Sequence, residues 1–210
     1  MRRTMTPLAI ATAVLALLAW PFDAQSGVPS PSNSSVDPCL VFCPVSDIDF
    51  HVIVRDLANN PVAGAVVKLD FSGCPSFTHC LGVPSSLIVS DVNRTVSEVA
   101  DVFGAAVFAM PMGGICPGSA VRIFADGVWL ATRSLASPDR DGNLFPDLTD
   151  EAAIQALAVA NSSDPTADFD CNGIVDAADV GIAAQHRFHA CPLAVPTAPR
   201  SWGAIKLLYR

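Results

Sequence analysis

The sequence predicts a mainly β fold, an antiparallel β-sandwich followed by a small α-helical module. Short runs in which apolar and polar residues alternate recur between residues 47 and 133, and turn-forming residues separate them. After Ser134 this pattern stops, and acidic stretches alternate with runs of helical apolar spacing. We therefore expect a sandwich at residues 45–136 and a second unit at residues 137–192.

Each expected strand has one apolar side. In the first strand, Phe50, Val52 and Val54 alternate with polar residues, which is typical of a half-buried strand. The clearest hairpin is centred on Asp126-Gly127, because Asp-Gly between two apolar runs favours a two-residue turn. The expected strands are residues 48–54, 67–71, 87–89, 95–99, 105–110, 121–125 and 128–133.

The composition is that of a folded, acidic protein. The 210 residues carry a formal net charge of −8, and 51% of them are hydrophobic while 15% are charged. This supplies ample apolar material for a core and excludes a disordered chain. The acidic balance argues against nucleic-acid binding, which needs clustered Lys and Arg.

The N-terminus has the features of a secretory signal peptide. Arg2 and Arg3 precede an apolar run at residues 8–20, and small and polar residues follow around Ala24. The run is shorter than the roughly 20 apolar residues that span a bilayer, and an uncleaved anchor is the alternative. We expect residues 1–24 to be removed and the mature chain to be secreted or at the cell surface, with no transmembrane segment.

Two further segments lie outside the two expected units. Residues 25–44 are rich in Ser, Pro, Gly and Asn and are expected to be a flexible linker. Residues 193–210 are a tail that mixes aromatic, aliphatic and basic residues. We expect this tail to add a strand to the sandwich or to act as an attachment or sorting signal.

The cysteines predict disulfides, because a secreted chain meets an oxidising compartment. The odd count leaves at least one thiol unpaired or intermolecular. The seven cysteines are Cys39, Cys43, Cys74, Cys80, Cys116, Cys171 and Cys191. We expect Cys171–Cys191 to clamp the last acidic stretch to the end of its helix, Cys74–Cys80 to form a local bridge, and Cys116 to pair with Cys39 or Cys43.

Three stretches of the sandwich segment stand out: residues 54–56 (VRD), 60–67 (NPVAGAVV) and 100–108 (ADVFGAAVF). The first two resemble the opening hairpin of bacterial Ig-like and carboxypeptidase-regulatory-like domains, and the third resembles a later segment of those domains. The match covers roughly residues 45–135 and departs from the family at Asn60, where glycine is commoner, and in its added cysteines. The resemblance implies an Ig-like sandwich, a fold that serves as a spacer or adhesive module and does not fix a function.

Residues 168–179 have the ligand spacing of an EF-hand-type calcium loop. Oxygen-bearing side chains fall at loop positions one, three, five, nine and twelve, and Gly173 falls at position six. Ca²⁺ prefers six to eight oxygen ligands, and a glycine at position six permits the sharp turn that wraps the loop around the ion. The alternative is an acidic, solvated turn.

Residues 139–150 repeat this spacing, and a helix-compatible run follows each copy. The first copy departs from the pattern because Leu144 replaces the turn glycine and Pro146 removes a backbone donor. Two sites are therefore expected, and a degenerate first site is the alternative.

A paired loop–helix unit with aspartate at position twelve resembles a dockerin type I domain. The resemblance implies two Ca²⁺ sites whose ligands are Asp139, Asp141, Asn143, the Phe145 carbonyl, Asp147 and Asp150 in the first loop, and Asp168, Asp170, Asn172, the Ile174 carbonyl, Asp176 and Asp179 in the second. It also implies a cohesin-like or cell-surface protein partner, bound at loop positions ten and eleven. These positions are Leu148, Thr149, Ala177 and Ala178, for which packing against the neighbouring helix is the alternative.

Other chemistry finds little support in the sequence. His186, His189 and Cys191 lack a fourth ligand for a zinc site, and we interpret them as residues at a helix end. Nucleophile-elbow and phosphate-loop motifs are absent, so we expect no enzyme activity.

The predicted function is that of a secreted, calcium-binding modular protein that mediates assembly or surface attachment. The alternative is an accessory component of extracellular polysaccharide degradation, either carbohydrate-binding or weakly catalytic. A line of exposed aromatic side chains on one sheet face would favour that alternative, and Trp129 is the only Trp of the sandwich.

Overall fold

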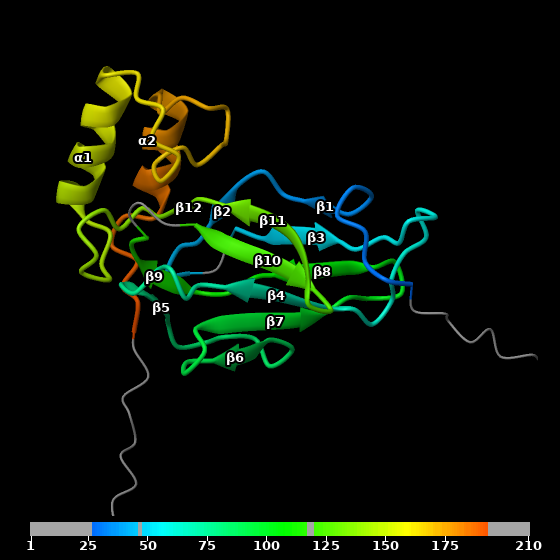
Figure 1. The fold of residues 1–210 in the computed structure, drawn as a ribbon. Helices are drawn as coiled ribbons and strands as arrows, with labels where there is room; N and C mark the ends of the chain where they lie inside the picture. Colours follow the sequence, from blue (N-terminus) through cyan, green and yellow to red (C-terminus); the bar gives the residue numbers. More distant parts are fainter. Residues whose placement is uncertain (1–26, 46–47, 117–119, 193–210) are drawn as a thin grey trace, which may run out of the picture.

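The computed structural model describes residues 27–45, 48–116 and 120–192. It shows two facing β-sheets with two short helices at one end (Figure 1). The expected signal peptide and C-terminal tail lie outside the described residues. Among the residues that are described, no helix is long and apolar enough to cross a membrane.

The larger sheet has five antiparallel strands, in the order β11-β10-β4-β7-β6, and the second has three, in the order β1-β3-β8. Two short pairs, β12-β2 and β5-β9, extend the sandwich toward the helices. The strands are β1 (Ser35–Val36), β2 (Leu40–Val41), β3 (Phe50–Ile53), β4 (Val66–Asp70), β5 (Phe77–His79), β6 (Ile88–Ser90), β7 (Thr95–Val99), β8 (Ala105–Phe108), β9 (Met112–Gly114), β10 (Val121–Ala125), β11 (Val128–Arg133) and β12 (Leu135–Ala136).

The alternation of apolar residues predicted the main strands correctly. All seven expected strands are present with small changes at their ends, and β8 stops at Phe108 instead of continuing to residue 110. The inward-facing residues of these strands form one core between the sheets, in which Phe50 and Phe108 lie opposite each other with ring centroids 6.4 Å apart. Mainly β architecture with sandwiched antiparallel sheets is therefore confirmed.

The expectation of a flexible linker at residues 25–44 was wrong for its described part. β1 pairs with β3, and β2 pairs in parallel with β12. Leu40 and Phe42 are among the most deeply buried side chains of the core. The prediction was based on the Ser- and Pro-rich composition of the whole segment. The short apolar run at residues 40–42 nevertheless has enough apolar surface for its burial to hold this part of the segment against the sandwich.

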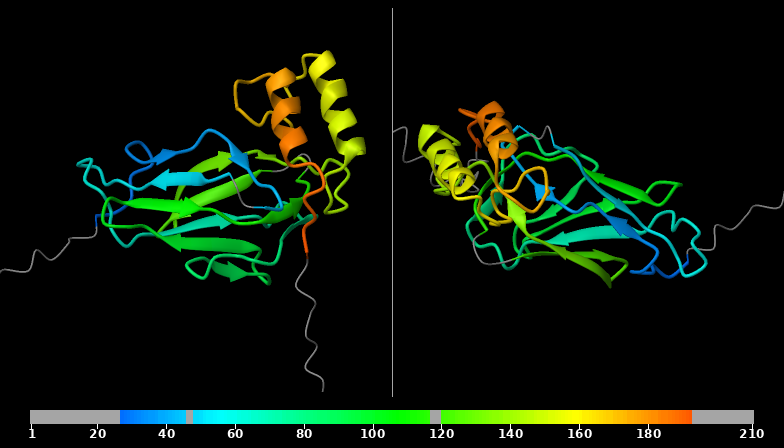
Figure 2. Two further views of the ribbon diagram at one scale, coloured as in Figure 1. Left: turned by 180° about the vertical axis from the view of Figure 1, so that it is seen from behind. Right: turned by 90° about the horizontal axis from the view of Figure 1, so that it is seen from above.

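The helices α1 (Leu148–Val159) and α2 (Ala177–Gln185) lie side by side at one end of the sandwich, as the two views of Figure 2 show. A second apolar cluster joins them to the sheets. In it, Val41 and Ala136 of the β2–β12 pair pack with Ile154, Phe169 and Val175 of the helical module. The two expected units therefore share a core at their boundary.

The observed disulfides correct every expected pairing. They are Cys39–Cys171, Cys74–Cys116 and Cys80–Cys191. Neither Cys171–Cys191 nor Cys74–Cys80 forms, and Cys116 pairs with neither Cys39 nor Cys43. The seventh cysteine, Cys43, is buried.

The path of the chain after α2 explains why Cys191 does not pair with Cys171. After α2 the chain passes the first acidic loop, where the Cys191 N–H donates to the Leu144 carbonyl, and reaches the sandwich, where the Leu81 N–H donates to the Pro192 carbonyl. This brings Cys191 to β5 and leaves Cys171 facing the N-terminal segment. Three disulfides are typical of proteins from an oxidising, non-cytoplasmic compartment.

Gly104 provides a test of the sandwich. It has a φ of +77°, and a Cβ at this position would lie 2.4 Å from the Val54 carbonyl oxygen. We expect Gly104→Ala to lower the free energy of unfolding by about 2–4 kcal/mol, because left-handed strain and a backbone clash add together. Gly127 has a similar φ of +81° with nothing nearby, so Gly127→Ala should cost only about 1 kcal/mol. Equal losses of unfolding free energy for the two variants, measured by urea denaturation, would contradict this expectation.

Candidate metal centre

The two acidic loops, residues 139–150 and 168–179, have the same backbone conformation. Position four has a positive φ in both loops, +76° at Gly142 and +58° at Cys171. Position six does too, +71° at Leu144 and +91° at Gly173. The first loop therefore makes the turn without a glycine, at a cost of about 1 kcal/mol for left-handed backbone at a leucine.

The aspartate at position twelve accepts three backbone N–H groups in each loop. In the first loop, Asp150 Oδ1 accepts the backbone N–H of Arg140 at 2.7 Å and of Asp141 at 3.0 Å, while Oδ2 accepts that of Asp147 at 2.8 Å. The second loop repeats all three contacts. Asp179 accepts from Phe169 at 2.6 Å, Asp170 at 3.3 Å and Asp176 at 2.8 Å.

Position nine of each loop begins the following helix. Asp147 is the N-cap of α1 and Asp176 is the N-cap of α2, and each forms a capping box with the aspartate at position twelve. Carboxylates in a first helical turn also interact favourably with the helix dipole. The residues that could hold a cation are thus the same ones that set where the two helices start.

Positions three and five are held by equivalent turns. The Asn143 N–H donates to Asp141 Oδ1 at 3.0 Å, and the Asn172 N–H donates to Asp170 Oδ1 at 3.1 Å. At position seven, the N–H groups of Phe145 and Ile174 donate to the asparagine side chains at 2.8 and 2.9 Å. The Phe145 and Ile174 side chains are exposed, so the apolar side chains turn away from the loop.

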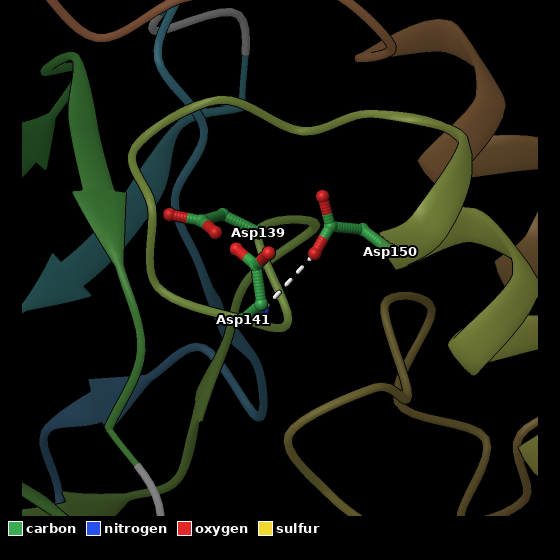
Figure 3. A group of neighbouring side chains, drawn as sticks. All are labelled: Asp139, Asp141 and Asp150. Atoms are coloured by element: carbon green, nitrogen blue, oxygen red, sulfur yellow. Dashed lines mark hydrogen bonds between the residues drawn. The ribbon is translucent and has the colours of Figure 1, made fainter.

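Three carboxylates converge in each loop. Oxygen atoms of Asp139, Asp141 and Asp150 lie within 4.8 Å of one another, and the same holds for Asp168, Asp170 and Asp179. Figure 3 shows the first group gathered inside the curve of the loop, with the Asp141 backbone bonded to Asp150. The carboxylates at positions one and twelve are buried in both loops, whereas those at position three are exposed.

Burying charged carboxylates together is costly unless a positive charge compensates them. The basic side chains beside the loops pair elsewhere, Arg140 with Asp164 and Arg187 with Glu151. The carboxylates of the two loops are instead held by backbone N–H groups, an arrangement that keeps them ionisable and oriented. This arrangement suits a hard cation that binds oxygen ligands.

The two loops differ at position one. Both oxygens of Asp139 accept backbone N–H groups, Oδ1 from Gly142 and Asn143 and Oδ2 from Leu144 and, at 3.0 Å, from Gly114 of β9. In the second loop, Asp168 Oδ2 accepts from Gly173 at 2.9 Å, but the buried Oδ1 has no hydrogen-bond partner. Since an unsatisfied buried carboxylate oxygen is costly, the second loop fits a cation better than the first.

Asp139 gives the metal-free protein a pH dependence. Burial raises the pKa of the Asp139 carboxyl above its ordinary value of 3.8, and the Asp150 carboxylate adds to this effect. Because the pKa is higher in the folded than in the unfolded state, the protonated Asp139 carboxyl favours folding. This contribution to stability is fully present below the unfolded pKa and is lost as the pH rises through the folded pKa.

We therefore expect the calcium-depleted protein to lose melting temperature relative to an Asp139→Asn variant as the pH rises above about 4. Millimolar Ca²⁺ should reverse this trend because the ion favours the carboxylate. Thermal melts of both proteins measure it, and parallel curves in calcium-free buffer would contradict the contribution of Asp139.

Two long-range contacts support the first loop and were not predicted from the sequence. The Gly114 N–H ties Asp139 to the sandwich, and the Arg140 guanidinium donates to the Thr166 carbonyl at 2.8 Å and to Asp164 at 3.1 Å, just before the second loop. The three partners lie 24–26 residues along the chain from the loop residues that they contact, so spacing within the loop carries no signal of them.

The predicted partner-binding residues lie at the starts of the helices. Leu148 and Thr149 begin α1, Ala177 and Ala178 begin α2, and all four are exposed instead of being packed against the neighbouring helix. Ala177 also lines a shallow apolar groove of about 260 Å³ between the helices, together with Ala158, Val159, Val180 and Gln155.

A zinc site at the end of α2 is not available to Cys191, because its sulfur is bonded to Cys80. His186 and His189 instead stack edge to face with ring centroids 5.7 Å apart. This agrees with the interpretation of these residues as parts of a helix end.

Comparisons with known proteins identify no family for this chain. No family model and no curated protein matches the sequence. Among solved structures, the chain is similar to the crystal structure of the Lin-41 filamin domain, with 15% sequence identity over 51% of this chain and 95% of that chain. With a TM-score of 0.27, this likeness supports no argument about fold or function. The mainly β architecture agrees with an Ig-like β-sandwich, and the resemblance to dockerins stays a prediction.

Proposed function

We propose that this chain is a secreted protein whose paired loops bind two Ca²⁺ ions and whose helix starts contact a protein partner. The observation that carries the calcium assignment is the set of four buried carboxylates, two in each of two loops of matching conformation, whose oxygen atoms converge. The partnerless Oδ1 of Asp168 supports it further.

The roles of the residues follow from their contacts. In each loop, the position-twelve aspartate is held by three backbone N–H groups, so its oxygens need little reordering when an ion binds. The aspartates at positions one and three supply further oxygens, and the asparagine, the position-seven carbonyl and the helix N-cap complete a ligand set of the size that Ca²⁺ prefers. The bound ion would compensate the charge that the fold buries.

Calcium titration of the chelator-treated protein by calorimetry tests this assignment. We expect two ions per chain, one ion for Asp168→Asn and one for Asp139→Asn. Asp49→Asn, which removes an exposed carboxylate from the sandwich, should still bind two. An absence of binding at millimolar Ca²⁺ would overturn the proposed function.

We further propose that Leu148, Thr149, Ala177 and Ala178 contact a cohesin-like or other cell-surface protein, so that the chain serves assembly or surface attachment. Their exposure at the starts of both helices supports this role. A Leu148→Asp/Ala177→Asp variant should lose retention on the cell surface, because two charges would be desolvated in the interface. Val92→Asp, at an exposed site of the sandwich, should keep it.

One observation favours carbohydrate binding as a second candidate. Phe124 lies directly across from the 55% exposed Trp129 in the β10–β11 register, so the two aromatic side chains share the outer face of the sheet. The Lys68 ammonium lies 4.8 Å from the centroid of the Phe124 ring, which leaves Trp129 as the more open surface. Binding on a glycan array with calcium present, lost in Trp129→Ala, would support this candidate.

A further inference from the structure

We propose that the Cys39–Cys171 disulfide is a thiol–disulfide exchange site for an external dithiol, and that its redox state sets the calcium affinity of the second loop. The second half of this inference rests on the proposed function. The chain would then bind calcium tightly at this loop only in an oxidising environment.

Accessibility distinguishes this disulfide from the other two. Cys74, Cys116, Cys80 and Cys191 are all buried, with 0–7% of their surface exposed. Cys39 and Cys171 are both half-buried. They also line the same cavity of about 320 Å³, at the junction of the sandwich and the second loop. Because exchange requires a thiolate to reach a sulfur atom, only this bridge is open to attack in the folded protein.

The position of Cys171 links the bridge to the candidate ligands. Cys171 is position four of the second loop, between Asp170 and Asn172, and it holds a left-handed φ of +58°. The first loop has Gly142 at the equivalent place, so it needs no such restraint. Cysteine adopts this conformation less readily than glycine, and the bridge helps to hold it there.

The other end of the bridge is fixed to the sandwich. Cys39 precedes β2, whose residues Leu40 and Val41 are buried and pair with β12. The Cys39 sulfur lies 3.5 Å from the backbone carbonyl oxygen of Asp168, position one of the same loop. The bridge therefore ties position four of the loop to a rigid element and packs against the backbone of position one, and its loss would release the ligand run 168–172.

The exchange is balanced with a dithiol as reductant. One thiolate of the dithiol attacks a sulfur of the Cys39–Cys171 bond, which breaks, and the other sulfur leaves as a thiolate and takes up a proton. The second thiol of the reductant then displaces the remaining cysteine from the mixed disulfide. The products are two cysteine thiols and one oxidised dithiol. By linkage, calcium in the second loop should in turn protect the bridge from reduction.

The first experiment uses the native, full chain and dithiothreitol as the probe. After mild reduction without denaturant, free thiols are alkylated and the labelled peptides are mapped. We expect new label on Cys39 and Cys171 well before label on the other disulfide cysteines, and slower labelling in millimolar Ca²⁺. Reduction of all three bridges at one rate, or of Cys80–Cys191 first, would overturn the assignment of the exchange site.

The second experiment measures calcium affinity in the oxidised and the mildly reduced protein. An Asp139→Asn variant reports the second loop alone, and an Asp168→Asn variant reports the first loop alone. We expect reduction to weaken binding by the second loop about tenfold and to leave the first loop nearly unchanged. A Cys39→Ser/Cys171→Ser variant should match the reduced protein without any reductant.

The outcomes separate this inference from the proposed function. If the oxidised protein binds no calcium, the proposed function fails and the coupling fails with it. If the oxidised protein binds calcium and reduction leaves the affinity of the second loop unchanged, the coupling alone is overturned.

Discussion

Removal of calcium by a chelator should lower the melting temperature of the whole molecule in a single transition, by about 10 °C for each ion lost. A micromolar site in millimolar calcium contributes about 4 kcal/mol to stability. For a chain of this size, about 1 kcal/mol corresponds to a shift of roughly 2–4 °C. Calorimetry with millimolar Ca²⁺ and with excess chelator measures this shift.

The expectation of a single transition comes from the ties between the two parts. From the sequence alone, chelation would be expected to unfold the C-terminal segment and to spare the sandwich. The structure instead links them through Cys39–Cys171, Cys80–Cys191 and a shared apolar cluster that includes Val41 and Phe169. Loss of the helical circular-dichroism signal at a lower temperature than the Trp129 fluorescence change would contradict this view.

Removal of the Cys80–Cys191 disulfide should destabilise the protein by about 4 kcal/mol. The bridge joins cysteines 111 residues apart, and both sulfurs are buried. Part of that separation is already shortened by Cys39–Cys171, and the chain-entropy treatment then gives about 4 kcal/mol for the loop that remains. Urea denaturation of Cys80→Ala/Cys191→Ala against the parent protein measures the loss.

A matched control removes a buried sulfur without breaking a cross-link. Cys43→Ala does this, because Cys43 is buried and belongs to none of the three disulfides. It should cost only about 1 kcal/mol for the small cavity that it leaves. A similar loss for the control and for the double variant would show that packing, and not the cross-link, accounts for the effect.

The local features of this fold could be predicted from the sequence because they depend on neighbours in the chain. The period-two alternation around Phe50 and the Asp126-Gly127 turn were enough to place β3, β10 and β11. The helix-compatible runs that were expected after the two acidic stretches likewise correspond to α1 and α2, which the aspartates at positions nine and twelve cap.

The long-range features could not be predicted, and the disulfides are the clearest case. Pairs at short separation, such as Cys74–Cys80 and Cys171–Cys191, have a low entropic cost of loop closure. The fold instead brings Cys39 to Cys171 across a sequence separation of 132 residues. Leu144 shows a different limit. A leucine at loop position six is unfavourable for a left-handed turn. The backbone N–H groups that donate to Asp139, including that of Leu144 itself, nevertheless hold Leu144 in the left-handed conformation.

The Cys39–Cys171 bridge also determines how the molecule would respond to tension. Residues 27 and 192, the two ends of the described chain, lie at opposite ends of the molecule (Figure 1). The shortest covalent route between them passes through this bridge and then along α2. The route contains 35 residues, 27–39 and 171–192, so it would extend to only about 120 Å. Without the bridge, a pulling force would pass along residues 27–80 to Cys80–Cys191, a route that adds β2, β3, β4 and β5 and leaves out α2. A reductant would thus decide whether α2 or these four strands bear the load.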